Sequence, residues 1–266
     1  MSVSGSELVD AVAAGLRRAR IDAQPVAPVR EQLGRGGIAA AYAVQEAITC
    51  ADLAEGRRLV GRKIGLTSKA VQRQLGVDQP DYGMLFADMN REEQTPIDLS
   101  ELIAPRIEAE IAFVMGRALD VERPTVADVI GAVDYMLPAF EIVDSRVRDW
   151  DISIIDTVAD NASSGLFVLG TTPVRLSAED LSLAGMVLEV DGEPVAFGAG
   201  AACLGHPLTA VRWLAARMAQ LGRPLGAGDI VLSGALGPMV PARAGAQCEA
   251  RILGVGSVRA SFGGVQ

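Results

Sequence analysis

The chain has 266 residues, half of them apolar, and a formal net charge of −9. This composition indicates a folded globular protein, either one large domain or a small domain joined to a larger one. The acidic charge argues against a nucleic-acid partner, because phosphate binding needs a basic surface. The sequence has no run of about 18 apolar residues and no signal-peptide pattern at its start, so we expect no membrane contact and a cytoplasmic location.

The N-terminal part, residues 1–80, is predicted to be mainly helical. Apolar residues recur at helical spacing over about 4–20, and an alanine-rich stretch over about 37–56 predicts a second helix. Residues 59–66 have the composition of a strand. These elements indicate a small N-terminal subdomain.

A short helix and a loop are expected next. The helix begins after a hydroxyl residue that can cap it, with Val71 and Leu75 facing inward. Residues 79–83 are rich in turn-forming types and predict a loop that carries Asp81.

Residues 81–266 are predicted to form a mainly β domain. Helices are expected at about 125–135 and 208–221, and Asp191-Gly192 predicts a hairpin turn. Strands outnumber helices without regular alternation, which favours a mixed or mainly antiparallel β core over a doubly wound sheet. The strands are expected at about 106–115, 137–143, 166–169, 186–190, 194–197, 229–233, 248–253 and 257–262.

Two carboxylates stand one residue apart inside the apolar stretch 106–115. Side chains alternate along a strand, so Glu108 and Glu110 share one face. Two like charges this close repel each other, and a shared cation is the simplest way to keep both ionised. Hard oxygen ligands suit Mg²⁺ or Mn²⁺. The alternative is an edge strand whose two glutamates are solvated.

A third glutamate, Glu141, lies in another apolar strand. Together the three glutamates supply half of an octahedral set of ligands and leave positions for substrate oxygens or water. The alternative is three scattered surface glutamates. Other carboxylates compete for the ligand role: Asp81, Asp88 and Asp144.

Lys63 and Asp81 are candidates for acid–base chemistry. A buried lysine near a metal can hold a substrate carboxylate, polarise a carbonyl or shift its pKa. The alternative is a solvated strand lysine. Asp81 follows a proline in the expected loop, where catalytic groups are often carried, and its alternative is a turn-forming aspartate. The only histidine, His206, has no nucleophile signature near it.

Eight motifs together carry a family resemblance. They resemble the 2-hydroxypenta-2,4-dienoate hydratases (2-keto-4-pentenoate hydratases), in the hydratase/decarboxylase branch of the fumarylacetoacetate hydrolase-like superfamily. The resemblance runs from about residue 37 to the C-terminus. The motifs occur in the family's order at 62–68, 76–83, 85–89, 107–110, 141–146, 158–165, 204–207 and 233–238.

The resemblance implies an α+β fold, in which a mixed, mainly antiparallel β roll joins a smaller N-terminal α/β part. It also implies a divalent metal (Mg²⁺ or Mn²⁺), a homo-oligomer, and a role in the meta-cleavage breakdown of aromatic compounds. The family's metal glutamates map onto Glu108, Glu110 and Glu141, and its active-site lysine and aspartate onto Lys63 and Asp81. The sibling 4-oxalocrotonate decarboxylase lacks this aspartate in its pattern, so Asp81 favours hydration.

The resulting hypothesis is a metal-assisted hydration. The substrate's carboxylate and 2-oxygen would chelate the metal, and ketonisation would make C4 electrophilic toward water. Lys63 would add positive charge, Asp81 would move a proton or orient the water, and Ser163 and Ser164 would hydrogen-bond the substrate carboxylate. The alternatives are a 4-oxalocrotonate decarboxylase, an acylpyruvate-type C–C hydrolase, and a non-catalytic assembly partner of the sibling decarboxylase.

Overall fold

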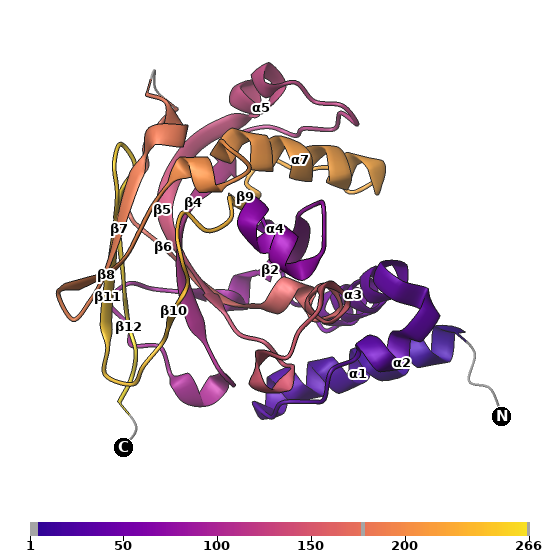
Figure 1. Cartoon of the computed structure of the whole chain (residues 1–266). Coiled ribbons are helices and arrows are strands. Elements are labelled where there is room, and N and C mark those ends of the chain that lie inside the picture. Colours follow the sequence, from indigo (N-terminus) through magenta and orange to yellow (C-terminus); the bar gives the residue numbers. More distant parts are fainter. Residues whose placement is uncertain (1–4, 177–178, 265–266) are drawn as a thin grey trace.

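The computed structural model describes residues 5–176 and 179–264. Two sheets form its body, and helices lie on one side of them (Figure 1). The larger sheet has the order β2 (Asp81–Phe86), β1 (Leu59–Gly65), β9 (Ile230–Leu232), β4 (Arg106–Met115), β5 (Val133–Val143), β6 (Ser164–Leu169) and β3 (Asn90–Arg91), with β10 (Val240–Pro241) paired to β4.

The smaller sheet has the order β12 (Gly256–Ser261), β11 (Gln247–Ile252), β7 (Gly185–Val190) and β8 (Glu193–Ala199). It packs through β12 and β11 against β5 of the larger sheet. Most neighbouring strands are antiparallel, whereas β1–β9 and β3–β6 are parallel. The prediction of a mixed, mainly antiparallel core is therefore confirmed.

The helices gather in two places. In Figure 1, α1 (Gly5–Asp22), α2 (Arg30–Leu33) and α3 (Gly37–Ala54) lie together at the lower right, whereas α5 (Val126–Ala132) and α7 (Pro207–Gln220) lie at the top. The short α4 (Lys69–Leu75) lies between these groups, and α6 (Ile154–Ala159) packs on α3. No helix in the described part of the chain is long and apolar enough to cross a bilayer.

Two apolar clusters stabilise this arrangement. The larger joins both sheets and α7, and the smaller joins α1 and α3 with Val158 and Ala159 of α6. Strand β1 belongs to the larger sheet, where it pairs with β2 and β9, so strand pairing crosses the predicted division at residue 80. The division into two domains stays a prediction.

Three local predictions were wrong. Asp81 to Gly83 do not form a loop but open β2, because they pair with β1. The helix predicted at 125–135 ends at Ala132, and Val133 and Tyr135, whose side chains favour strands, begin β5. Val71 does not face inward, since it is 39% exposed. The Leu75 side chain lies outside the described residues.

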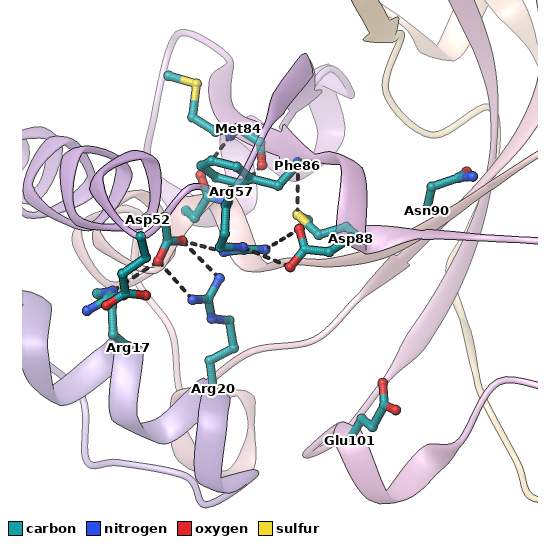
Figure 2. Close-up of polar contacts among 12 residues, drawn as sticks. Arg17, Arg20, Asp52, Arg57, Met84, Phe86, Asp88, Asn90 and Glu101 are labelled. Carbon is teal, nitrogen blue, oxygen red and sulfur yellow. Dashed lines mark hydrogen bonds and ion pairs between the residues drawn. The ribbon is translucent and has the colours of Figure 1, made fainter.

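An ionic network ties the N-terminal helices to the chain that enters the larger sheet. Asp52 of α3 is buried and accepts hydrogen bonds from Arg17 and Arg20 of α1 and from Arg57, which also reaches Asp88 (Figure 2). The Arg17 Nε and Arg20 Nη2 atoms each lie 3.0 Å from Asp52 Oδ1. Asp52 is thus the carboxylate that all three guanidinium groups share, while Arg17 also pairs with Glu55.

Replacing Asp52 by alanine is expected to lower the free energy of unfolding by about 3 kcal/mol, because it removes the carboxylate that pairs with half-buried Arg20 and one of the two carboxylates that pair with Arg17 and with Arg57. The Asp52 side chain is only 1% exposed. Asp88→Ala is the matched control, since its side chain is 59% exposed and such pairs contribute about 1 kcal/mol or less. Urea unfolding of both variants measures the difference, and equal losses would contradict this role for Asp52.

Candidate metal centre and active site

Three glutamates converge on the paired strands β4 and β5. Glu108 stands directly opposite Glu141 in the antiparallel ladder, and Glu110 lies two residues further along β4 on the same face. One carboxylate oxygen from each lies within 4.8 Å of those of the other two. The structure therefore brings together the three predicted ligands.

These carboxylates are short of partners. Glu110 Oε2 accepts a hydrogen bond from the Gly234 amide at 2.8 Å, but its Oε1 is buried without one. Both oxygens of Glu141 are also buried without a well-aligned hydrogen bond, although Lys63 Nζ lies 3.0 Å from Oε1 as an ion pair. Three carboxylates thus face one ammonium group. A divalent cation would balance this charge and satisfy the orphaned oxygens, so the residues fit the implied metal.

The electrostatics of the cluster follow from burial and crowding. Burial, with the nearby charge of Glu141, raises the pKa of Glu108 to about 7. The same causes, with Glu108 added, raise the pKa of Glu110 well above its usual range. Burial opposes the charge on Lys63, but the surrounding carboxylates outweigh it and raise the pKa of Lys63. Lys63 is therefore a fixed cation at neutral pH.

These shifts predict how stability depends on pH. Since the pKa values of Glu108 and Glu110 are raised on folding, the metal-free folded state binds protons that the unfolded chain has lost, and its stability falls as pH rises from about 4.5 to about 7. A bound cation replaces those protons. We expect Mg²⁺ to raise Tm by roughly 5 °C or more near pH 8 and by much less near pH 5. Thermal unfolding with and without Mg²⁺ measures this, and a pH-independent effect would contradict it.

Lys63 and Asp81 meet beside this cluster because β1 pairs with β2. Gly65 of β1 stands opposite Asp81, and a Cβ on Gly65 would lie 2.1 Å from Asp81 Oδ1 and 3.6 Å from Lys63 Nζ. Asp81 Oδ1 is buried without a hydrogen bond. Burial is the main cause that raises the pKa of Asp81 to about 6; repulsion from Glu141 adds to it, and the two together outweigh the attraction by Lys63. Such a group can both take up and release a proton near neutral pH.

A cavity of about 660 Å³ reaches this cluster at Glu108. Glu108 and Gly65 form part of its wall, and the absence of a side chain on Gly65 leaves room for the Asp81 carboxylate behind it. The rest of the wall is mainly apolar and includes Leu66, Val71, Phe197, Ala202, Leu236 and Met239. The cavity is large enough for a small organic acid with its hydrocarbon part against this wall.

Both predicted serines lie outside the wall of this cavity: Ser163 is in the turn between α6 and β6, and Ser164 is the first residue of β6. Ser163 Oγ lies 3.3 Å from the hydroxyl of Thr157, and Ser164 Oγ donates to the Asn161 carbonyl at 2.8 Å. Asn161 and Ser163, together with the residue between them, have positive φ, a strained conformation that often marks functional segments. A substrate contact by either serine stays a prediction.

The competing carboxylates have other partners. Asp144 accepts hydrogen bonds from the backbone amides of Ile103 and Ala104, and Asp88 pairs with Arg57 near the surface. Two glycines were missed by the sequence analysis: Gly65, which leaves room for Asp81, and Gly234, which donates to Glu110. Both lie inside the motifs used above, but only the spatial neighbours reveal what they do.

Comparison with known proteins identifies the family. Residues 60–262 match the family model described as fumarylacetoacetate (FAA) hydrolase C-terminal. The chain belongs to the fumarylacetoacetate hydrolase family. Within this family it is 61% identical over 237 residues to the TodF product hydratase of Pseudomonas putida F1, covering 89% of this chain and 88% of that protein. It is 55% identical over 260 residues to a 2-keto-4-pentenoate hydratase of Paraburkholderia phymatum, and the match covers 98% of this chain and 99% of that protein.

A solved structure of the family shares the whole fold. The 4-oxalocrotonate decarboxylase from Pseudomonas putida G7, complexed with magnesium and adipate, superposes with a TM-score of 0.93 at 38% identity. The match covers 98% of this chain and 99% of that one. The predicted fold class, an α+β fumarylacetoacetate hydrolase-like fold, is thereby confirmed.

Proposed function

We propose that this chain is a hydro-lyase that converts 2-hydroxypenta-2,4-dienoate and water to 4-hydroxy-2-oxopentanoate in the meta-cleavage degradation of aromatic compounds. The observation that carries the proposal is a triad of glutamates beside Lys63 and Asp81, in which Glu110 and Glu141 are buried with orphaned oxygens and Glu108 lines an apolar cavity. The names of the hydratase relatives support the same reaction.

Glu108, Glu110 and Glu141 would hold Mg²⁺ or Mn²⁺. The ion, when bound, supplies a Lewis acid for the substrate's carboxylate and 2-oxygen. The magnesium complex of the decarboxylase, which shares this fold, supports binding of a divalent ion. All three glutamates are carried by strands in the centre of the larger sheet, so the site is built on rigid elements.

The chain's own residues carry the remaining steps. Lys63 holds a positive charge beside the oxygen that becomes negative as the dienol loses its proton. Asp81 is placed to move a proton or to orient the water that adds to C4, and its raised pKa suits proton transfer near neutral pH. The apolar wall of the cavity would receive the hydrocarbon end of the substrate. Ser163 and Ser164 remain our candidates for hydrogen bonding to the carboxylate of the substrate.

The purified chain assayed with 2-hydroxypenta-2,4-dienoate tests this function. We expect loss of the dienol absorbance, abolition of this activity by EDTA and its recovery with Mg²⁺. Full activity in the metal-free protein would refute the metal's part. Product analysis with 4-oxalocrotonate and with an acylpyruvate separates the decarboxylase and hydrolase alternatives, and activity of the isolated chain argues against a role only as an assembly partner.

Assembly is a separate part of the proposal. We expect a homo-oligomer, and a complex with the sibling decarboxylase. Light scattering of the chain alone and after mixing with that decarboxylase measures both. A monomer that stays separate under these conditions would contradict them.

A further inference from the structure

The strand ladder beside Glu110 contains one extra residue. Strand β9 pairs regularly with β4 as far as Leu232, which faces Ala112, and the Ser233 amide then donates to the Ile111 carbonyl at 3.0 Å. The next backbone bond to β4 comes from Leu236, whose amide donates to Ala109 at 2.9 Å. The three residue steps from Ser233 to Leu236 therefore span the same length as the two steps from Ile111 to Ala109 of β4. One extra residue on one side of an antiparallel pair is the geometry of a β-bulge.

The bulge points a backbone amide at a side chain. The Gly234 N–H does not pair with the backbone of β4 but donates to Glu110 Oε2. Gly234 has φ +96°, and a Cβ there would lie 2.5 Å from two side-chain atoms of Thr67, so a larger residue is excluded on two grounds. With Oε2 held in this way, Glu110 Oε1 is the oxygen left without a partner.

Two buried side chains hold the Gly234 peptide from its other end. The Gly234 carbonyl accepts a hydrogen bond from Ser233 Oγ at 3.0 Å and from Cys203 Sγ at 2.9 Å. Ser233 Oγ also accepts from the Ile111 amide of β4 at 3.2 Å. Both side chains are fully buried. Burial, with the charge of Glu110, raises the pKa of the Cys203 thiol to about 12, so the thiol keeps the proton that it donates.

We propose that Ser233 and Cys203 are positioning residues, which fix the Gly234 amide against Glu110 and thereby orient this carboxylate toward a divalent cation. The proposal rests on the metal site of the proposed function and extends it to residues that do not touch the ion. Groups that orient metal ligands typically change metal affinity by 10–100-fold when they are removed.

Binding of Mn²⁺ to the metal-free protein, followed by electron paramagnetic resonance, tests the proposal without relying on activity. Ser233→Ala is expected to weaken Mn²⁺ binding about tenfold or more, and Cys203→Ala to weaken it several-fold. Cys203→Ser keeps a donor and should bind nearly as the parent does. Unchanged affinity in both alanine variants would overturn the proposal, as would a serine variant as weak as Cys203→Ala.

Ser145→Ala is the matched control for loss of a buried hydroxyl. The Ser145 side chain is also fully buried, and its Oγ accepts the Val147 amide at 3.1 Å. The Mn²⁺ affinity of Ser145→Ala should equal that of the parent. A loss of affinity as large as in Ser233→Ala would overturn the proposal. If Ser233→Ala does not fold, the two Cys203 variants decide. A parent protein that binds no Mn²⁺ would instead contradict the proposed function, which is a distinct result.

Discussion

The variant Glu141→Gln is expected to lose at least roughly a thousandfold in hydration rate, because a bound metal contributes several kcal/mol to such reactions. Glu141 stands opposite Glu108 and is the ion-pair partner of Lys63, so one substitution removes a proposed metal ligand and changes the charge around the lysine. Both of its oxygens are buried, and the neutral amide keeps the side-chain shape. Steady-state kinetics with Mg²⁺ measure the loss of hydration rate, and titration with Mn²⁺ measures the loss of metal affinity.

Glu189→Gln provides the matched control. Glu189 is also a strand glutamate paired with a cation, Arg251, but it lies in the smaller sheet. Its rate and its metal affinity should equal those of the parent. Normal Mn²⁺ binding and normal turnover in Glu141→Gln would remove Glu141 from the metal site.

Replacing Asp81 by asparagine is expected to lower the hydration rate by about 10²–10⁴, the usual contribution of a positioned acid–base group. Mn²⁺ affinity should stay within a few-fold of the parent, because Asp81 is not one of the three converging glutamates proposed to bind the metal. The loss should appear in kcat, since the asparagine still fills the space opposite Gly65. Absorbance kinetics and metal titration of the same sample separate the two effects.

Asp78→Asn is the control for this second prediction, since Asp78 lies three residues earlier and is exposed. It should retain the parent rate. An unaffected rate in Asp81→Asn would mean that Asp81 takes no part in the proton transfer. A parallel loss of metal binding would instead place Asp81 among the ligands.

Local patterns in the sequence predicted the parts of the site that depend on one strand at a time. The alternation of side chains placed Glu108 and Glu110 on one face of β4, and that face is where the structure has them. The pairing of Glu108 with Glu141 depends on the register between β4 and β5. Register is set by contacts across the sheet, which local periodicity does not contain.

The errors have the same origin. Proline and glycine around Asp81 are typical of a loop, but Asp81 pairs with β1 and so belongs to β2, where its carboxylate lies near Lys63. The role of Gly65 depends on the side chain of Asp81, and that of Gly234 on the side chain of Thr67. Both side chains are more than 15 residues away along the chain. The atoms that surround a glycine, and leave no room for a side chain, are brought there by the tertiary fold. The sequence alone shows only that a glycine is present.

A crystal structure of the Mn²⁺-loaded protein, with anomalous scattering recorded at the manganese edge, tests the central claim most directly. We expect one ion bound by an oxygen each of Glu108, Glu110 and Glu141 at about 2 Å, next to the apolar cavity. An ion held by other residues, or a protein soaked in Mn²⁺ that shows no ion between β4 and β5, would contradict it.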